Sequence, residues 1–251
     1  MIVLKSPPEI ALMRRAGRIL AEVLDSLPGL VKPGLSTLAI DRAVERHIRR
    51  RGATPAFKGY RGYPATACVS INAEIVHGIP RADRRLADGD IVSVDIGCVV
   101  DGYYADCAVT LAVGEIDAPS RELLDVTRES LDLAVAACRV GGRLSDVSHA
   151  VQSHVEGHGL AIVRAFVGHG IGRALHEAPE VPNFGEPGYG PRLRPGMVLA
   201  IEPMVTMGQP EVDIGDDGWT AVTRDGSLSA HFEHTVAITE HGPLVLTASR
   251  A

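Results

Sequence analysis

Two aspartates of this sequence stand in segments that are otherwise apolar. Asp95 follows a run of Val and Ser, and Asp106 comes later in the chain, just past an Asp101-Gly102 turn. Burying a carboxylate is costly unless it is paired or bound to a metal. Each aspartate is therefore a candidate metal ligand. The alternative, for each one singly, is an ordinary salt-bridged or turn carboxylate.

Two glutamates occupy comparable positions in the second half of the chain. Glu202 ends the apolar run 198–201, and Glu233 leads into the apolar run 235–238. When the second half is aligned on the first, Asp95 falls on Glu202, and after a change of register Asp106 falls on Glu233. Since the two pairs match through an internal repeat, we expect a pseudo-two-fold arrangement that brings four carboxylates together.

The repeat extends beyond the carboxylates. The alignment that places Asp95 on Glu202 also superimposes identical residues at five positions between 34 and 52: Gly34, Ala43, Val44, His47 and Gly52 on Gly141, Ala150, Val151, His154 and Gly159. The same register continues through a distant segment, where Leu86 and Gly89 fall on Leu193 and Gly196. The change of register is an insertion between Glu202 and Glu233. The alternative is a chance match, because Asp and Glu are common residues.

Four clustered carboxylates cannot all stay ionised without cations nearby. Two divalent ions supply four positive charges and balance the cluster. Oxygen-rich ligation with one imidazole favours manganese, iron or cobalt over a closed structural zinc site. Two such ions activate water and polarise a carbonyl group, which is hydrolytic chemistry.

Three histidines are candidates for the imidazole ligand. His169 lies among glycines after an apolar segment, and glycines let backbone approach a site closely. His176 resembles the start of an H-E-x-x-H motif, but position 180 is Glu, so that zinc motif is absent. His77 precedes a Gly turn. His231 and His234 flank Glu233. They are either site residues or ordinary strand residues beside a site. Four others lie in helical stretches and are interpreted as packing or surface residues: His47, His149, His154 and His158.

Other classes of site have little support. The sequence contains no G-x-S-x-G, P-loop or G-x-G-x-x-G motif. Its four cysteines show no C-x-x-C spacing and read as reduced thiols of a cytoplasmic protein: Cys68, Cys98, Cys107 and Cys138.

Apolar periodicity and turn signals predict helices and strands in alternation. Ser6, Pro7 and Glu9 form a helix start, and Pro28-Gly29 and Pro33-Gly34 are turn signals after the helical pattern. The other expected helices span 36–50, 119–139 and 145–157. Strand patterns occupy 66–76, 90–113, 161–168, 197–206, 219–224 and 231–239. We therefore expect an α+β protein: a single catalytic domain, 1–251, whose pseudo-repeat halves divide near residue 118.

Composition and charge argue against several classes of protein. The 251 residues carry a net charge of −6, with 45% hydrophobic and 22% charged residues, which is ordinary globular composition. The acidity argues against nucleic-acid binding by charge. No apolar run approaches the roughly 18 residues that a membrane helix needs, and the N-terminus does not resemble a secretory signal.

The chain closely resembles the type I methionine aminopeptidase family, in its short bacterial form. The segments that carry the resemblance are Asn72-Ala73-Glu74-Ile75-Val76-His77-Gly78-Ile79-Pro80, Asp88 through Asp106, Gly168-His169-Gly170-Ile171-Gly172, Ile201-Glu202-Pro203-Met204, Trp219 and Ser229-Ala230-His231-Phe232-Glu233-His234-Thr235. The resemblance implies the pita-bread fold, with two pseudo-symmetric halves of helices and antiparallel strands around a central dinuclear metal site.

The resemblance also implies roles for particular residues. It implies metal ligands at Asp95, Asp106, His169, Glu202 and Glu233, with Asp106 and Glu233 bridging two divalent ions. It implies that Glu202 moves the proton of the attacking hydroxide, and that His77 and His176 contact the peptide and stabilise the transition state. A methionine pocket is implied at Tyr60, Tyr63, Cys68 and Trp219, for which core packing is the alternative. A monovalent cation is a further expectation near Asn72 and Ser229.

The expected activity is removal of the N-terminal methionine from nascent proteins and peptides whose second residue is small. Three pocket positions depart from common family residues, which affects substrate and inhibitor preference: Phe57, Arg61 and Leu175. Expected partners are N-terminal Met peptides and, transiently, the ribosome, with a monomeric cytoplasmic enzyme and no nucleic acid or membrane. The alternatives are an X-Pro aminopeptidase or dipeptidase of the same fold, or a non-catalytic binding member of that fold.

Overall fold

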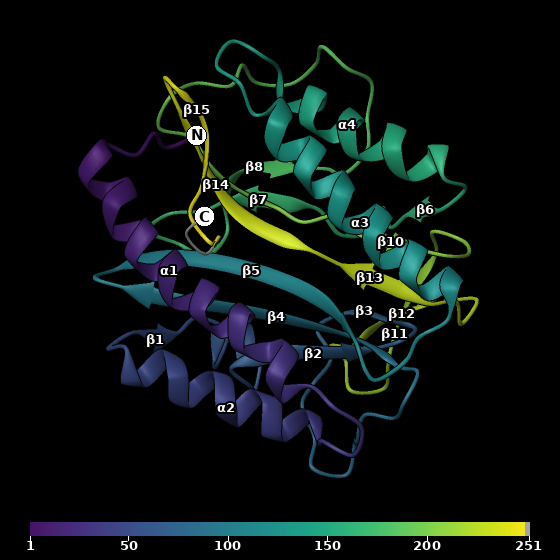
Figure 1. Ribbon diagram of the computed structural model, residues 1–251. Coiled ribbons are helices and arrows are strands. Elements are labelled where there is room, and N and C mark those ends of the chain that lie inside the picture. The colour runs from purple at the N-terminus through teal and green to yellow at the C-terminus, as the bar shows by residue number, and fades with distance from the viewer. Residues whose placement is uncertain (249–251) are drawn as a thin grey trace.

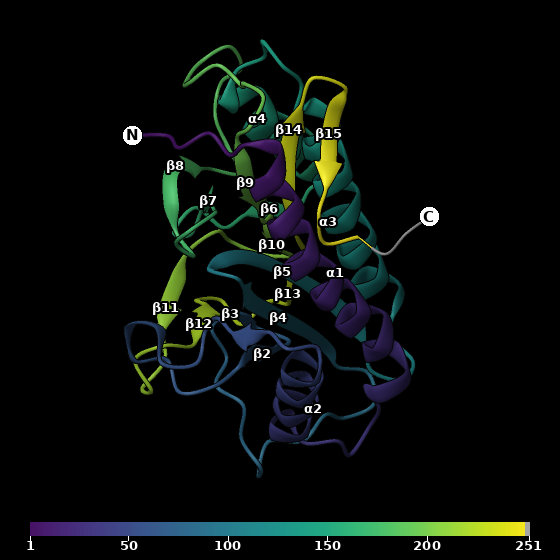
Figure 2. The ribbon, with the colours of Figure 1, turned by 90° about the vertical axis from the view of Figure 1, so that its left-hand side faces the viewer.

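A curved antiparallel sheet lies at the centre of the computed structural model, which describes residues 1–248 (Figure 1). The four helices are α1 (Pro7–Leu30), α2 (Thr37–Arg50), α3 (Ala118–Ala137) and α4 (Leu144–Gly157). Figure 2 shows α1 and α3 on one side of the sheet, with short strands on the other. The functional side chains described below come from the sheet and from loops at this second side.

The main sheet has nine strands. In spatial order its main path runs through β1 (Thr54–Pro55), β4 (Ile91–Val100), β5 (Tyr103–Ala112), β14 (Glu233–Thr239), β9 (Val198–Ile201), β7 (Gly168–Gly170) and β8 (Glu177–Val181). Off this path, β2 (Ala67–Ile71) pairs with β4, and β15 (Gly242–Val245) pairs with β14.

Two small sheets flank the main one. The first contains β13 (Ser229–His231), β10 (Met204–Thr206) and β6 (Ala161–Ile162). The second contains β11 (Val212–Ile214), β12 (Ala221–Thr223) and β3 (Glu74–Val76), and it joins a segment of the first half to segments of the second. A short 3-10 helix, η1 (Tyr60–Gly62), precedes β2.

The same backbone contacts occur in both halves, at positions that the repeat relates. Gly34 donates its N–H to Leu86 O at 2.7 Å, and Gly141 donates to Leu193 O at 3.0 Å. Both glycines have a positive φ, 85° and 89°, which residues with a side chain rarely adopt. Arg85 Nη1 and Arg192 Nη1 then donate to the carbonyl groups of the same two glycines, at 2.8 and 3.1 Å. Each half therefore connects its second helix to its central strands in the same way.

Each pair of helices covers its own hydrophobic cluster. The buried face of α1 and α2 includes Leu20 and Val44, which belong to a cluster with residues of β2, β4 and β5. The buried face of α3 and α4 includes Leu131 and Val151, which belong to a cluster with residues of β9 and β14. Burial of these faces is the main favourable contribution to folding, and it fixes the sheet from one side.

The structure differs from the sequence patterns at several places. α1 continues through the first turn signal, Pro28-Gly29, and ends at Leu30, because near a helix end the missing proline N–H removes few bonds and Val31 N still donates to Leu27 O at 2.8 Å. The predicted strand 161–168 is not continuous: it begins with β6 and ends at Gly168, the first residue of β7, and these two strands belong to different sheets. Sequence patterns also missed β1, β8, β11 and β15.

The hairpin of β4 and β5 forms as predicted. Val100 pairs with Tyr103 across the two-residue turn, and both turn residues have positive φ, 50° for Asp101 and 79° for Gly102. Among the described residues, no helix is long and apolar enough to cross a membrane.

Candidate active site

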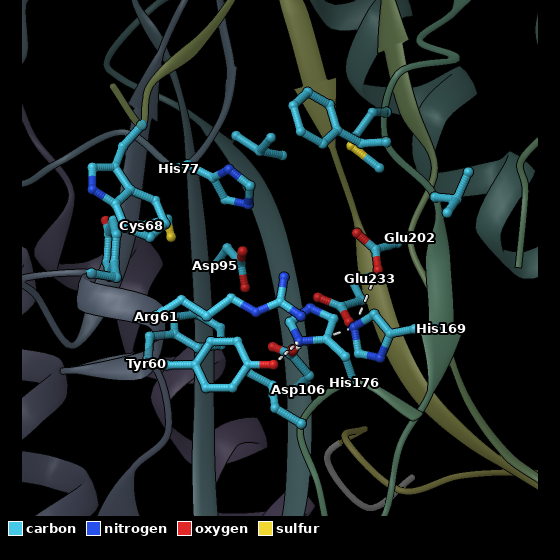
Figure 3. Close-up of a pocket in the computed structure, with 18 residues that line it drawn as sticks. Tyr60, Arg61, Cys68, His77, Asp95, Asp106, His169, His176, Glu202 and Glu233 are labelled. Atoms are coloured by element: carbon cyan, nitrogen blue, oxygen red, sulfur yellow. Dashed lines mark hydrogen bonds and ion pairs between the residues drawn. The ribbon is translucent and has the colours of Figure 1, made fainter. Parts of the chain in front are cut away.

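A cavity of about 310 Å³ opens beside the central strands of the main sheet (Figure 3). It is lined by all five predicted metal ligands, by His77 and His176, and by the four predicted pocket residues: Asp95, Asp106, His169, Glu202, Glu233, Tyr60, Tyr63, Cys68 and Trp219. The structure thus gathers at one place residues that lie between positions 60 and 233 of the sequence.

Strand register explains why the carboxylates meet. Asp95 on β4 and Glu233 on β14 are both directly opposite Ala108 of β5, so the three form one row across the sheet. Residues opposite each other point to the same face, and so does Asp106, two positions from Ala108. On β9, Ile201 is opposite His234, so the next step along the ladder brings Glu202 toward Glu233.

The imidazole of His169 completes the group. Ligand atoms of Asp106, His169 and Glu233 all lie within 4.8 Å of one another. His169 Nε2 is 3.5 Å from Glu202 Oε1 and 4.0 Å from Asp106 Oδ2. Nδ1 of the same ring is 2.9 Å from Gly170 O, which can only accept, so Nδ1 carries the proton. Nε2 is then left with a lone pair directed at the carboxylates, as a metal ligand requires.

These carboxylates are buried without enough donors. In residues 1–248, Oδ1 of Asp95, Oδ1 of Asp106 and Oε1 of Glu233 have no hydrogen-bond partner. Burial, together with the neighbouring carboxylates, raises the pKa of Asp106 and of Glu233 well above the usual range. Burial likewise raises the pKa of Asp95 and Glu202. Uncompensated oxygens around one neutral imidazole fit divalent cations, which supply the missing positive charge.

His176 lies next to His169, with ring centroids 4.2 Å apart. Its Nδ1 is 2.8 Å from the hydroxyl of Tyr60, whose ring stacks on it at 5.3 Å (Figure 3). Burial, with smaller contributions from His169 and Arg61, lowers the pKa of His176 to about 4. The ring is therefore neutral at pH 7, and Nε2 is the atom left free to face a substrate.

His77 lies on the opposite wall. Its backbone has a φ of 63°, and its ring makes edge contacts with Phe166 at 5.5 Å and with Trp219 at 6.4 Å. Burial lowers the pKa of His77, so this ring is also neutral at pH 7.

An apolar recess adjoins the carboxylates. Tyr63 contacts Trp219 edge to face at 5.2 Å, and Cys68 is opposite Asp95 in the β2–β4 ladder. The sequence analysis assigned no role to four further lining residues: Val76, Phe166, Val167 and Met204. Phe166 and Val167 directly precede Gly168, so their closeness to His169 in sequence was the one signal available. Phe57, Arg61 and Leu175 also line the cavity.

Two other candidates lie near the site. His231 is buried at 1% exposure, and its Nε2 is 3.9 Å from Glu202 Oε2, whereas His234 Nδ1 contacts Thr247 Oγ1 at 2.9 Å. Asn72 and Ser229 are brought together: the N–H of Ser229 donates to Asn72 O at 2.9 Å. That contact does not test a monovalent cation, which stays a prediction.

Comparison with known proteins places this site in a family. A family model described as metallopeptidase family M24 matches residues 11–240. The chain belongs to metallopeptidase family M24. A metallopeptidase hydrolyses peptide bonds with the help of metal ions, in agreement with the cluster of buried carboxylates beside His169 described above. The predicted family resemblance is confirmed.

Relatives in the family match over nearly the whole chain. The methionine aminopeptidase of Clostridium perfringens is 52% identical over 247 residues, covering 98% of this chain and 99% of the relative. Methionine aminopeptidase 1 of Bacillus subtilis is 51% identical, with the same coverage.

Solved structures of the family confirm the pita-bread fold. The crystal structure of methionine aminopeptidase from Thermotoga maritima has a TM-score of 0.98 at 48% identity and covers 99% of this chain and 100% of that chain. The prolidase of Pyrococcus furiosus has a TM-score of 0.76 at 23% identity and is covered to 66%. This second likeness shows the shared fold alone.

Proposed function

We propose that this protein is a methionine aminopeptidase, which hydrolyses the peptide bond after an N-terminal methionine when the second residue is small. The observation that carries the proposal is one cavity that combines buried carboxylates short of donors with an apolar, sulfur-lined recess. Relatives of that name at about half identity support it over the full length. A thioether side chain suits such a recess because it is unbranched and polarizable.

The M24 fold implies divalent ions, and this chain offers a fitting set of donors. Asp95, Asp106, His169, Glu202 and Glu233 line the cavity and would hold two of them. When bound, the ions supply Lewis acidity for the scissile carbonyl and for water. Manganese, iron and cobalt all suit such donors, and which one is native stays a prediction.

The chain's own residues would share the remaining work. Glu202 takes the proton of the attacking water and passes it to the leaving amine. His176, held by Tyr60, donates from Nε2 to the oxygen on which charge develops, and His77 contacts the peptide from the other wall. Tyr60, Tyr63, Cys68 and Trp219 enclose the methionine side chain, and Phe57, Arg61 and Leu175 tune preference at the rim.

Hydrolysis of X-Pro peptides is the second candidate, because proline-directed enzymes share this fold. Their likeness to this chain is confined to the fold, and the high-identity relatives carry the methionine aminopeptidase name. A non-catalytic member of the fold is disfavoured by the complete ligand set. A monomeric, cytoplasmic enzyme with transient ribosome contact also stays a prediction.

The test is release of methionine from Met-Ala-Ser by metal-free protein titrated with manganese, cobalt, iron and zinc. We expect metal-dependent release that Glu202→Ala abolishes, and no turnover of an X-Pro peptide. Metal content of the variant is measured in parallel, because Glu202 has two proposed roles. A folded protein that releases no methionine with any metal, or that prefers the X-Pro peptide, would overturn the proposal.

A further inference from the structure

A buried lysine near the N-terminus contacts the loop that carries His176. Lys5 Nζ lies 2.6 Å from Glu177 Oε2, and the two side chains are only 3% and 14% exposed. The same amino group donates to Val3 O at 3.1 Å, and the backbone N–H of Lys5 donates to Gly196 O at 2.7 Å. Lys5 is therefore fixed at both its backbone and its charged end.

Glu177, the partner of Lys5, closes the loop on itself. While Oε2 faces Lys5, Oε1 accepts the backbone N–H groups of Arg173 at 2.7 Å and Ala174 at 3.1 Å. A Cβ at Gly172 would collide with the Lys5 side chain, so the lysine packs directly on this backbone. One carboxylate thus couples the buried charge of Lys5 to the conformation of residues 172–177.

His176 directly precedes Glu177 in this loop. Its ring is held on the cavity side by the hydroxyl of Tyr60, 2.8 Å from Nδ1 (Figure 3). On the other side, the backbone next to His176 is held by the Lys5–Glu177 ion pair. Removing the lysine would leave the partly buried carboxylate of Glu177 without its cation, which is costly and favours rearrangement of the loop.

We infer that Lys5 is a positioning residue for the reaction: through its ion pair with Glu177 it sets the position of His176 over the metal-ligand cluster. The role rests on the proposed function, since it concerns the donor that faces the developing charge. Misplacement of a catalytic group by about 1 Å can lower the rate about 10²-fold. Because Lys5 lies away from the recess, its loss should lower kcat and leave KM nearly unchanged.

The kinetic test uses Lys5→Met, which keeps the length of the apolar stem and removes the charge. We expect kcat for Met-Ala-Ser to fall about 10-fold to 100-fold with KM within about 2-fold. In a His176→Ala background the same substitution should have no further effect on kcat, because both changes act through one group. Arg15→Met is the matched control: it breaks the exposed Arg15–Asp101 pair, 59% and 60% exposed, and should leave both constants unchanged.

Hydrogen exchange supplies a readout that needs no activity. In Lys5→Met, the amides of Arg173 and Ala174 should exchange faster than in the wild type, because their acceptor Glu177 is released. Unchanged exchange, unchanged kcat, or an equal loss of kcat with His176 already removed would each overturn the positioning role. An inactive wild-type protein would instead contradict the proposed function, so the two failures are distinguishable.

Discussion

The two halves of this protein build the same support and use it differently. In the first half, β4 and β5 are 10-residue strands joined by a two-residue turn, and they carry Asp95 and Asp106. In the second half, β9 has 4 residues and β14 has 7, and residues between them form β10 to β13. Glu202 and Glu233 nevertheless come to the same face as the aspartates. The carboxylates therefore belong to what the halves have in common.

His169, the proposed imidazole ligand, has no histidine counterpart in the first half. His169 is opposite Ala200 in the β7–β9 ladder, and the repeat that aligns Asp95 with Glu202 equates Ala200 with Ser93. In the β2–β4 ladder the residue opposite Ser93 is Ser70, whose hydroxyl accepts the N–H of Gly78 at 3.1 Å. The positions that the repeat relates thus carry His169, the proposed metal ligand, in the second half and a structural hydroxyl in the first. Trp219 lies in the longer connection of the second half. The positions that occur in both halves supply the carboxylates. Positions without a counterpart supply the imidazole of His169 and the ring of Trp219, which forms part of the recess wall.

The largest expected effect comes from substituting the carboxylates that the repeat places in both halves. Asp106→Asn and Glu233→Gln each keep the shape and remove one negative charge, so both should lower kcat for Met-Ala-Ser about 10²- to 10³-fold. Metal content, measured by mass spectrometry after dialysis, should fall in both. Asp101→Asn in the exposed turn of the same hairpin is the control and should change neither. Full activity in one of the two variants would show that the repeat-related positions are not equivalent.

The next test compares His169 with Ser70, the residue at the corresponding place of the first half. His169→Ala should weaken binding of one metal ion at least about 10-fold, since even residues that only support ligands cost that much. Ser70→Ala, at the corresponding place of the first half, should leave metal affinity unchanged. Competition with a chromophoric chelator measures both. Equal losses in the two variants would mean that His169 acts through the sheet rather than as a ligand.

Without metal ions, burial of the clustered carboxylates should make the stability of the folded protein depend on pH. Burial raises the pKa of Asp95 to about 7, so the folded metal-free protein holds a proton that the unfolded chain releases near pH 4. The contribution of Asp95 to the stability of the metal-free protein is therefore fully present below about pH 4 and is lost as the pH rises from there through about 7.

Melting temperature at pH 5 to 8, with a chelator or with saturating manganese, measures this effect. The metal-free protein should lose several degrees over this range, because each kcal/mol shifts Tm by about 2–4 °C in a chain of this size. Bound cations replace the protons, so the loaded protein should show a weaker decline. A metal-free protein whose Tm rises between pH 5 and 8 would contradict the raised pKa values.

Much of the support could be predicted from sequence because its signals are local. Ser36 caps α2 by accepting the N–H of Ala39, so the expected start of this helix is right to within one residue. The repeat was visible because identical glycines, Gly34 and Gly141, were needed at similar positive φ values. β8 was missed because Pro179 and two glutamates lower its strand propensity, and such a strand is tolerated at the end of the sheet order.

The contacts that support the candidate site could not be predicted from the sequence as well as its central residues could. The carboxylates and His169 stood out as polar groups in apolar or glycine-rich segments, and a family resemblance assigned their roles. The ion pair of Lys5 with Glu177 joins residues 172 positions apart, and no periodicity or motif encodes a contact of that range. The bond between Tyr60 and His176 is similarly distant, at 116 positions. Such long-range contacts between side chains depend on the assembled fold and cannot be predicted from either segment alone.

The smallest expected effect tests whether the two halves are equivalent as support. Val44 and Val151 are related by the repeat, and each is 1% exposed in its own cluster. Val44→Ala and Val151→Ala should each lower the free energy of unfolding by about 1–3 kcal/mol, with kcat unchanged, because each removes two methyl groups far from the cavity. Urea unfolding of metal-saturated protein measures both. If only Val44→Ala lowered kcat, the first half would position the site more strictly than the second, and the division between shared support and unshared chemistry would fail.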